Sequence, residues 1–386
     1  MLRRSEENQI AVLPSSRILP PSTCLSIRTF CRRFVASSVL LLTLAPALLA
    51  APKPLWPGSH YTEQDREAAL ERGLKFIYRI ASNPANFSQS GPDLLFCFYT
   101  ISSTARSHDL RNMARTMGRE LALEWRRQHR DPPTDNAAEV YLFVLGTLAS
   151  DGILGNFDPA LRERVQQSAA RFSARDFMQF DPRVEPPPSN IAESCSPCDA
   201  KTPVTFRSRY DVWLDSLIFS YMGESYGVTL GATYADVLKW IPAMRPYPPP
   251  ADEDTLDDVS YAITHVVYTL NGYHRYRLSP SWLPQEFSYL RKNITEAEKY
   301  GDPEILGEFM DALRAFGEDD SSPEIQTAME YLLSHQNTDG SWGNADDDVY
   351  TRYHTTWTAI DGLRQYSYHG RRLKSLRLLP LLRDRR

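Results

Sequence analysis

Two kinds of helical segment alternate along this chain, and that alternation restricts the fold more than any other feature. One kind is amphipathic with charged faces and covers residues 62–82, 105–129, 158–177, 232–241, 294–317 and 322–335. The segments of the other kind are apolar nearly all round, and such a helix needs neighbours on every side. Runs of alternating apolar and polar residues are few. We therefore predict an all-α fold.

The apolar segments also share a local pattern, in which an ionisable residue stands directly before an aromatic-rich run. They are Asp93 before LLFCFY, Glu139 before VYLFVL, Asp211 before VWLDSL, His265 before VVYTLN and His354 before TTWTAI. This repeat predicts helical hairpins arranged as an inner and an outer ring. The wide interval between His265 and His354 indicates insertions or a repeat too diverged to recognise.

A family resemblance covers residues 323–363. The stretch QNTDGSWG resembles the QW repeat of squalene and other class II terpene cyclases, in which the residues matching Gln336 and Trp342 tie one helix end to the next turn. The stretch YHTTWTAIDGL resembles the zinc-binding segment of protein prenyltransferase β subunits, which implies a zinc-ligand role for His354. Both families share the α/α toroid, so the resemblance implies one such domain over residues 51–386.

The chemistry of neither family carries over whole. Class II cyclases protonate their substrate with a DxDD motif, and the closest match here, DEDTLDD at 252–258, does not fit it. The aspartate–cysteine pair of the prenyltransferase zinc site has no counterpart either. The resemblance therefore predicts the fold and leaves the reaction open.

The repeat predicts a site, because inner helices that run parallel bring matching positions to one end of the ring. We expect the five ionisable residues to line one cavity at helix N-termini. As ligands of one divalent ion, zinc or iron, we predict Asp211, His265 and His354. As catalytic carboxylates we predict Asp93, Glu139 and Asp215. The alternative is that these residues are ordinary helix caps. His274 and His369 are predicted to be surface residues.

Composition excludes one class of function and favours others. The chain has 43 basic and 48 acidic residues, without the basic surplus of a nucleic-acid binder. A toroid mouth rich in Trp and Tyr suits a metal-dependent enzyme that acts on a hydrophobic or aromatic small molecule. Two alternatives stay open: a non-catalytic binding or scaffold protein, and a periplasmic polysaccharide lyase or hydrolase with a glycan substrate.

An apolar run at residues 34–51 follows Arg28, Arg32 and Arg33. A basic flank, an apolar stretch and small residues at its end predict a secretory signal peptide over residues 1–50. We expect an exported protein, periplasmic or secreted. The alternative is an uncleaved membrane anchor.

Three further segments interrupt or end the helical pattern. The proline-rich insertions at 181–203 and 242–250 are expected to be surface loops or a loop over a pocket. Cys195 and Cys198, in the first insertion, predict a local disulfide or a pair of metal ligands. The basic and apolar tail at 371–386 forms an outer helix or contacts a membrane surface or partner.

Overall fold

The computed structural model describes residues 53–189, 191–192, 206–373 and 378–382. In chain order the elements are α1 (Glu63–Ala81), α2 (Pro84–Thr104), α3 (His108–Gln128), α4 (Ala137–Leu154), α5 (Pro159–Ala169), α6 (Ala174–Met178), β1 (Ile191–Ala192), β2 (Phe206–Arg207), α7 (Arg209–Tyr226), α8 (Tyr234–Leu238), α9 (Ile241–Met244), α10 (Glu253–Asn271), η1 (Pro280–Trp282), α11 (Pro284–Tyr300), α12 (Pro303–Phe316), α13 (Pro323–Ser334), α14 (Val349–Leu363) and α15 (Leu379–Leu382). Within these residues the only sheet is the antiparallel pair β1–β2. The all-α prediction is confirmed.

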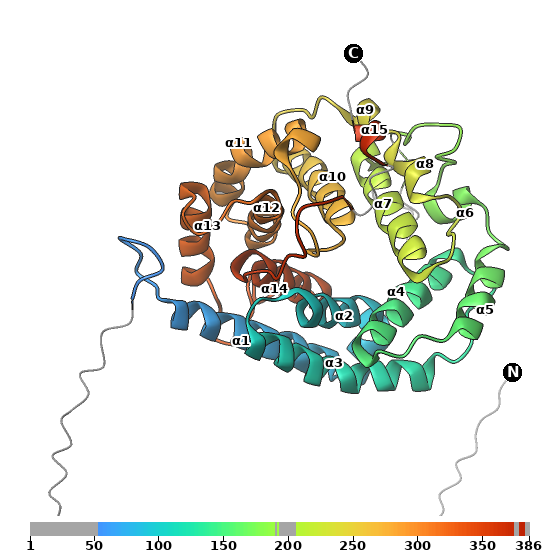
Figure 1. Cartoon of the computed structure of the whole chain (residues 1–386), viewed down its shortest axis with the longest axis horizontal. Coiled ribbons are helices and arrows are strands. Elements are labelled where there is room, and N and C mark those ends of the chain that lie inside the picture. The colour runs from blue at the N-terminus through green and yellow to red at the C-terminus, as the bar shows by residue number, and fades with distance from the viewer. Residues whose placement is uncertain (1–52, 190, 193–205, 374–377, 383–386) are drawn as a thin grey trace, which may run out of the picture. The chain divides into compact units, whose positions relative to one another are not determined.

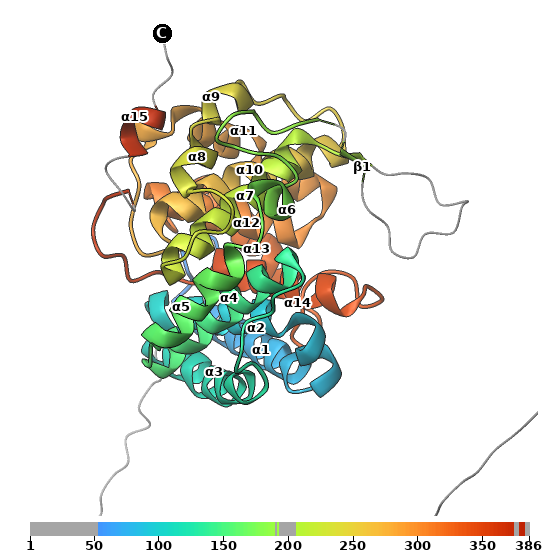
Figure 2. The same ribbon diagram turned by 90° about the vertical axis from the view of Figure 1, so that its right-hand side faces the viewer.

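Six helices contact one another in a closed order, α2–α4–α7–α10–α12–α14 and back to α2. The other long helices lie outside them (Figure 1). For example, α1 packs against α14 and α2, α3 against α2 and α4, and α11 against α12 and α10. Seen from the side, α1, α2 and α3 gather at one edge and α8, α9 and α11 at the opposite edge (Figure 2).

The helix α12 is the repeat that the sequence pattern did not reveal. Residues 294–317 were expected to form one helix, but the chain breaks at Gly301, whose φ is +73°. The side chain of Asp302 then caps the new helix by accepting from the Glu304 amide at 2.7 Å, and Pro303 occupies the first helical position. The long interval between His265 and His354 thus contains one further inner helix.

The expected helix starts need a correction. Asp93 lies in the middle of α2 and His265 in the second half of α10, whereas Glu139 and Asp211 do occupy first turns. His354 lies in the second turn of α14. Asp93 and His265 are not at helix starts because their helices begin further upstream, where Asn83 and Asp252 are the N-caps of α2 and α10.

Trp342 and Gln336 of the QW-like motif both donate hydrogen bonds to helices. Its indole Nε1 donates to the Leu332 carbonyl of α13 at 2.7 Å, and its side chain is fully buried. Gln336 donates to the Ala69 carbonyl of α1 at 2.9 Å. The motif therefore joins the end of α13 to α1.

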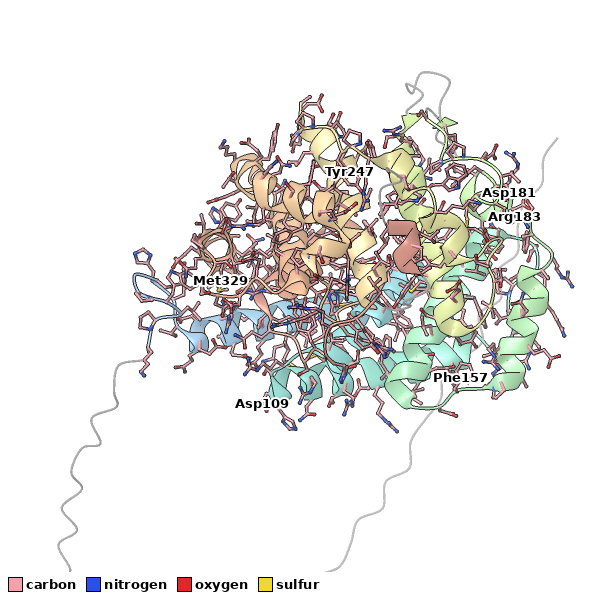
Figure 3. The ribbon with its side chains drawn as sticks, turned by 45° about the horizontal axis from the view of Figure 1, so that its top comes forward. Asp109, Phe157, Asp181, Arg183, Tyr247 and Met329 are labelled. Atoms are coloured by element: carbon pink, nitrogen blue, oxygen red, sulfur yellow. The ribbon has the colours of Figure 1, made fainter. Side chains whose placement is uncertain are left out.

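The described parts of both proline-rich segments are tied to the helices. Asp181 and Arg183 form an ion pair at 2.7 Å and lie side by side in Figure 3. Trp240 donates to the Pro182 carbonyl at 2.8 Å. Tyr247, labelled in Figure 3, donates to Glu286 at 2.6 Å.

Several predictions concern residues that the structure does not describe. The predicted signal peptide over 1–50 and the Cys195–Cys198 pair lie outside the described residues. Within the described ranges one helix, α4, is long and apolar enough to cross a membrane. It is one of the six helices of the closed order, and 61% of its apolar window is buried in the protein.

Candidate functional site

Glu304, in the first turn of α12, is the centre of the candidate site. Its Oε1 accepts a hydrogen bond from the Tyr261 hydroxyl of α10 at 2.9 Å. Its Oε2 accepts from the Thr355 hydroxyl of α14 at 2.8 Å. His354 Nδ1 lies 2.9 Å from Oε1. Glu304 thus joins three of the six inner helices.

The pair of Glu304 and His354 is charged. Burial opposes charge on both groups, yet the imidazole charge and three hydrogen bonds lower the pKa of Glu304 to about 2. Burial likewise acts to lower the pKa of His354, but the charge and hydrogen bond of Glu304 outweigh it and raise that pKa to about 10. At neutral pH the site therefore contains a carboxylate and an imidazolium.

His265 carries the opposite protonation. Its Nδ1 lies 2.9 Å from the Tyr261 carbonyl, which fixes that nitrogen as the donor. Burial is the main cause that lowers the pKa of His265 to about 4, and the nearby charge of His354 lowers it further. One imidazole of the site is therefore neutral at neutral pH and the other is protonated.

Further carboxyl groups surround the two histidines. Asp93 accepts from the Tyr353 hydroxyl at 2.9 Å, and burial raises its pKa. Glu308 lies one helical turn after Glu304 and accepts a hydrogen bond from Thr264. Burial raises the pKa of Glu308 to about 8 despite that bond and the nearby charge of His354. The pKa values of Glu304 and Glu308 are thus shifted in opposite directions, although the two residues are only one helical turn apart.

Aromatic rings cover the histidines. Tyr350 stacks on His354 with ring centres 5.2 Å apart and an angle of 17°. Trp357 meets the edge of His354 at 5.8 Å, and its indole Nε1 is buried without a hydrogen-bond partner among the described residues. Tyr268 lies 5.2 Å from His265. The site therefore offers aromatic faces next to titratable groups.

The two carboxylates of α7 are paired with an arginine, and one of them, Asp215, also acts on the site through its charge. Arg207 donates to Asp211 at 2.5 Å and to Asp215 at 2.6 Å, so these two carboxylates, four residues apart, share one face of α7. Burial raises the pKa of Tyr350, and four carboxylates add to that rise through their charge: Asp93, Glu304, Glu308 and Asp215. Side chains from α2, α7, α12 and α14 therefore converge.

The predicted metal ligands do not form a compact set. His265 and His354 influence one another electrostatically, whereas Asp211 is bound to Arg207. Among the residues that the structure describes, the only three of His, Cys, Asp or Glu type whose ligating atoms lie within 4.8 Å of one another are elsewhere. Glu139 is exposed. The metal role of Asp211, His265 and His354 stays a prediction without a preformed site.

That other group is His274, Asp311 and Asp361, which are all buried and could hold a metal ion. The prediction of His274 as a surface residue is wrong, because only 2% of it is exposed. His369 is exposed as predicted. The group was missed because its members come from three separate segments, and neither aspartate stands before an apolar run.

Comparisons of the chain with protein-family models, with curated proteins and with solved structures find no match. The resemblance of residues 323–363 to cyclases and prenyltransferases therefore remains a prediction from local motifs.

Proposed function

We propose that the chain is an enzyme that uses His354 as a proton donor and His265 as a proton acceptor on an uncharged, ring-bearing substrate. A neutral glycan is the substrate class that fits best, and the reaction is hydrolysis, in which His265 takes a proton from the attacking water and His354 gives a proton to the departing sugar oxygen. The observation that carries the proposal is the 2.9 Å contact between Glu304 Oε1 and His354 Nδ1. It directs the other ring nitrogen, Nε2, away from Glu304.

The contact between Glu304 and His354 identifies His354 as the proposed acid. A carboxylate that holds Nδ1 fixes the orientation of an imidazole and stabilises its protonated form. Within the described part of the chain, Nε2 of His354 has no hydrogen-bond partner. The His354 side chain also keeps 18% of its surface exposed. A substrate oxygen that binds at Nε2 would accept a proton from a preorganised donor.

The second imidazole, that of His265, is the proposed base. Because Nδ1 of His265 donates to the Tyr261 carbonyl, the lone pair is on Nε2. Tyr261 also donates its hydroxyl to Glu304, so one residue orients both imidazoles. Two titratable groups whose pKa values are driven apart in one site are the usual arrangement for acid and base catalysis.

The carboxyl groups and aromatic rings around the two histidines favour a neutral, ring-bearing substrate. Several carboxyl groups converge with one imidazolium, which disfavours a diphosphate or another strongly anionic substrate. The rings of Trp357 and Tyr350 lie next to His354. Sugar rings pack well against aromatic side chains, while their hydroxyl groups bind carboxylates. A neutral glycan combines both properties.

We also propose that the closed order of six inner helices is an α/α toroid, and that the protein is exported. The contact order of the helices supports the first proposal. The basic flank and the apolar run at 34–51 support the second. An exported toroid with acid and base groups on its inner helices agrees with a polysaccharide hydrolase better than with a cytosolic diphosphate enzyme.

The test is a screen of the purified protein against neutral and uronic-acid polysaccharides. Release of reducing ends from a neutral polysaccharide reports the proposed hydrolysis. Ultraviolet absorbance of a new double bond, which forms by elimination on a uronic acid, would contradict the uncharged substrate. His354→Asn should lower the rate by about 10²–10⁴-fold, the usual contribution of a positioned acid. His108→Asn, on the exposed start of α3, is the matched control. Glycan binding without turnover would instead favour the scaffold alternative.

A further inference from the structure

We propose that His274, Asp311 and Asp361 bind one divalent transition-metal ion, zinc first, and that this ion fastens three segments of the helical ring. His274 follows α10, Asp311 belongs to α12 and Asp361 to α14. One ligating atom from each lies within 4.8 Å of the other two. This centre is separate from the His354 site.

The two sites are related by the helix repeat. Asp311 follows Glu304 by seven residues on α12, and Asp361 follows His354 by seven residues on α14. Seven residues are two turns, about 10 Å along the axis. The same faces of both helices thus carry the acid–base site near their N-terminal ends and the proposed metal centre deeper along the helices.

Several polar atoms of this group are buried without a hydrogen-bond partner among the described residues. Asp311 is 1% exposed, and neither of its carboxylate oxygens has a hydrogen-bond partner among the described residues. Nδ1 of His274 also lacks one, although it lies only 3.1 Å from Asp311 Oδ2. Asp361 accepts from Arg364 at Oδ1, and its Oδ2 lies 3.7 Å from Nε2, the other ring nitrogen of His274. A buried carboxylate without hydrogen-bond donors, such as that of Asp311, is costly, and a metal ion would satisfy it.

The donor set suits a transition metal. One imidazole nitrogen and two carboxylate oxygens are ligands of zinc, iron and manganese, with bonds of about 2.0–2.2 Å to zinc. Neighbouring ligand atoms round such an ion lie about 3.3 Å apart, so the three side chains, whose ligating atoms lie within 4.8 Å of one another, would move closer together on binding. Calcium, which takes six to eight oxygen ligands, fits poorly.

The surrounding residues hold the ligands in place. The chain turns sharply through Gly272, Tyr273 and His274, and the His274 amide donates to Asn271 Oδ1 at 2.9 Å. The ring of Tyr366 stacks on His274 with centres 4.8 Å apart. Arg364 also donates to Thr104 of α2 at 3.0 Å. The centre therefore lies where α14 meets α2 and the closed order of helices is completed.

Metal analysis of the purified full-length protein tests the proposal. We expect about one ion per chain by mass spectrometry, and a melting temperature about 5 °C lower after removal of the ion by a strong chelator. Zinc added back to the chelated protein should restore the melting temperature with saturation at one equivalent. Protein that is isolated without metal, and whose melting temperature does not respond to zinc, iron(II) or manganese, would overturn the proposal in favour of a histidine ion-paired with two aspartates.

Variants separate this centre from the acid–base site. Asp311→Asn should lower the metal content by more than about tenfold, whereas Asp319→Asn, an exposed aspartate just beyond α12, should retain it. His354→Asn should lose turnover yet retain the ion. If Asp311→Asn does not fold, the zinc titration of the chelated wild-type protein still decides. Loss of the ion from His354→Asn but not from Asp311→Asn would place the metal at the other site.

Discussion

Glu304 and His354 lie fifty residues apart in the chain, and their side chains meet at 2.9 Å where α12 packs against α14. Each holds the other in its charged form, with the pKa of the carboxyl lowered to about 2 and that of the imidazole raised to about 10. Neither group is exposed by more than 18%. A charge pair that water screens so little can orient a proton donor throughout the neutral range.

The rate of the proposed reaction should follow a broad bell with pH. Activity needs His265 without its proton, so kcat/KM should rise as pH increases through about 4. It also needs His354 with its proton, so kcat/KM should fall as pH increases through about 10. A Glu304→Gln variant should move the upper limb to lower pH, because the charge that holds the imidazolium is gone. An unchanged upper limb in that variant would exclude His354 as the acid.

Gly307→Ala should destabilise the protein although alanine favours helices. Gly307 of α12 faces Gly362 of α14, and a Cβ on Gly307 would lie 2.5 Å from the Thr358 carbonyl oxygen. Forcing the helices apart costs about 1–3 kcal/mol, more than the helix gain of about 1 kcal/mol. Urea unfolding measures the difference. Gly91→Ala, with a movable Phe87 ring at 3.3 Å, should have the smaller effect.

Trp342→Ala should lower the free energy of unfolding by about 3–5 kcal/mol, because it removes a fully buried indole and its bond to Leu332. Leu123→Ala, at a side chain that is 53% exposed on α3, should change it by less than about 0.5 kcal/mol. Equal effects of the two substitutions in denaturant unfolding would show that the QW-like motif does not hold α13 to α1.

Export predicts a shortened protein. Mass spectrometry of the N-terminus should find a start near Ala51, since the apolar run ends in small residues there. Full-length protein that starts at Met1 and fractionates with the membrane would support the anchor alternative. Full-length protein in the cytosolic fraction would contradict export.

The sequence predicted the architecture better than the chemistry. Alternating amphipathic and apolar segments of helical periodicity predicted an all-α fold, because periodicity reports which faces are buried. The pattern missed α12, since its break at Gly301 was hidden in a continuous charged stretch. It thereby missed Glu304 and Glu308, although Glu304 also stands directly before an apolar residue.

Predictions of where single polar residues lie were less accurate than the prediction of the helices. Asp93, His265 and His354 do share one electrostatic environment, as the repeat suggests. Asp211 does not join the histidines in one site. Its carboxylate is paired instead with Arg207, which lies two residues before the start of α7. His274 became buried through a turn with two non-glycine residues at positive φ, Tyr273 and His274 itself, which no periodicity reports. Such contacts depend on tertiary packing that a local pattern does not contain.

The most direct test of the proposed acid–base pair is an NMR titration of the imidazole rings, with His265→Asn and His354→Asn variants to assign the signals. We predict that at neutral pH the wild-type protein has His354 protonated and His265 neutral. In Glu304→Gln the pKa of His354 should fall toward its ordinary value of 6.5 while His265 stays neutral. A folded wild-type protein in which His354 is neutral at neutral pH, or in which Glu304→Gln leaves its titration unchanged, would contradict the account.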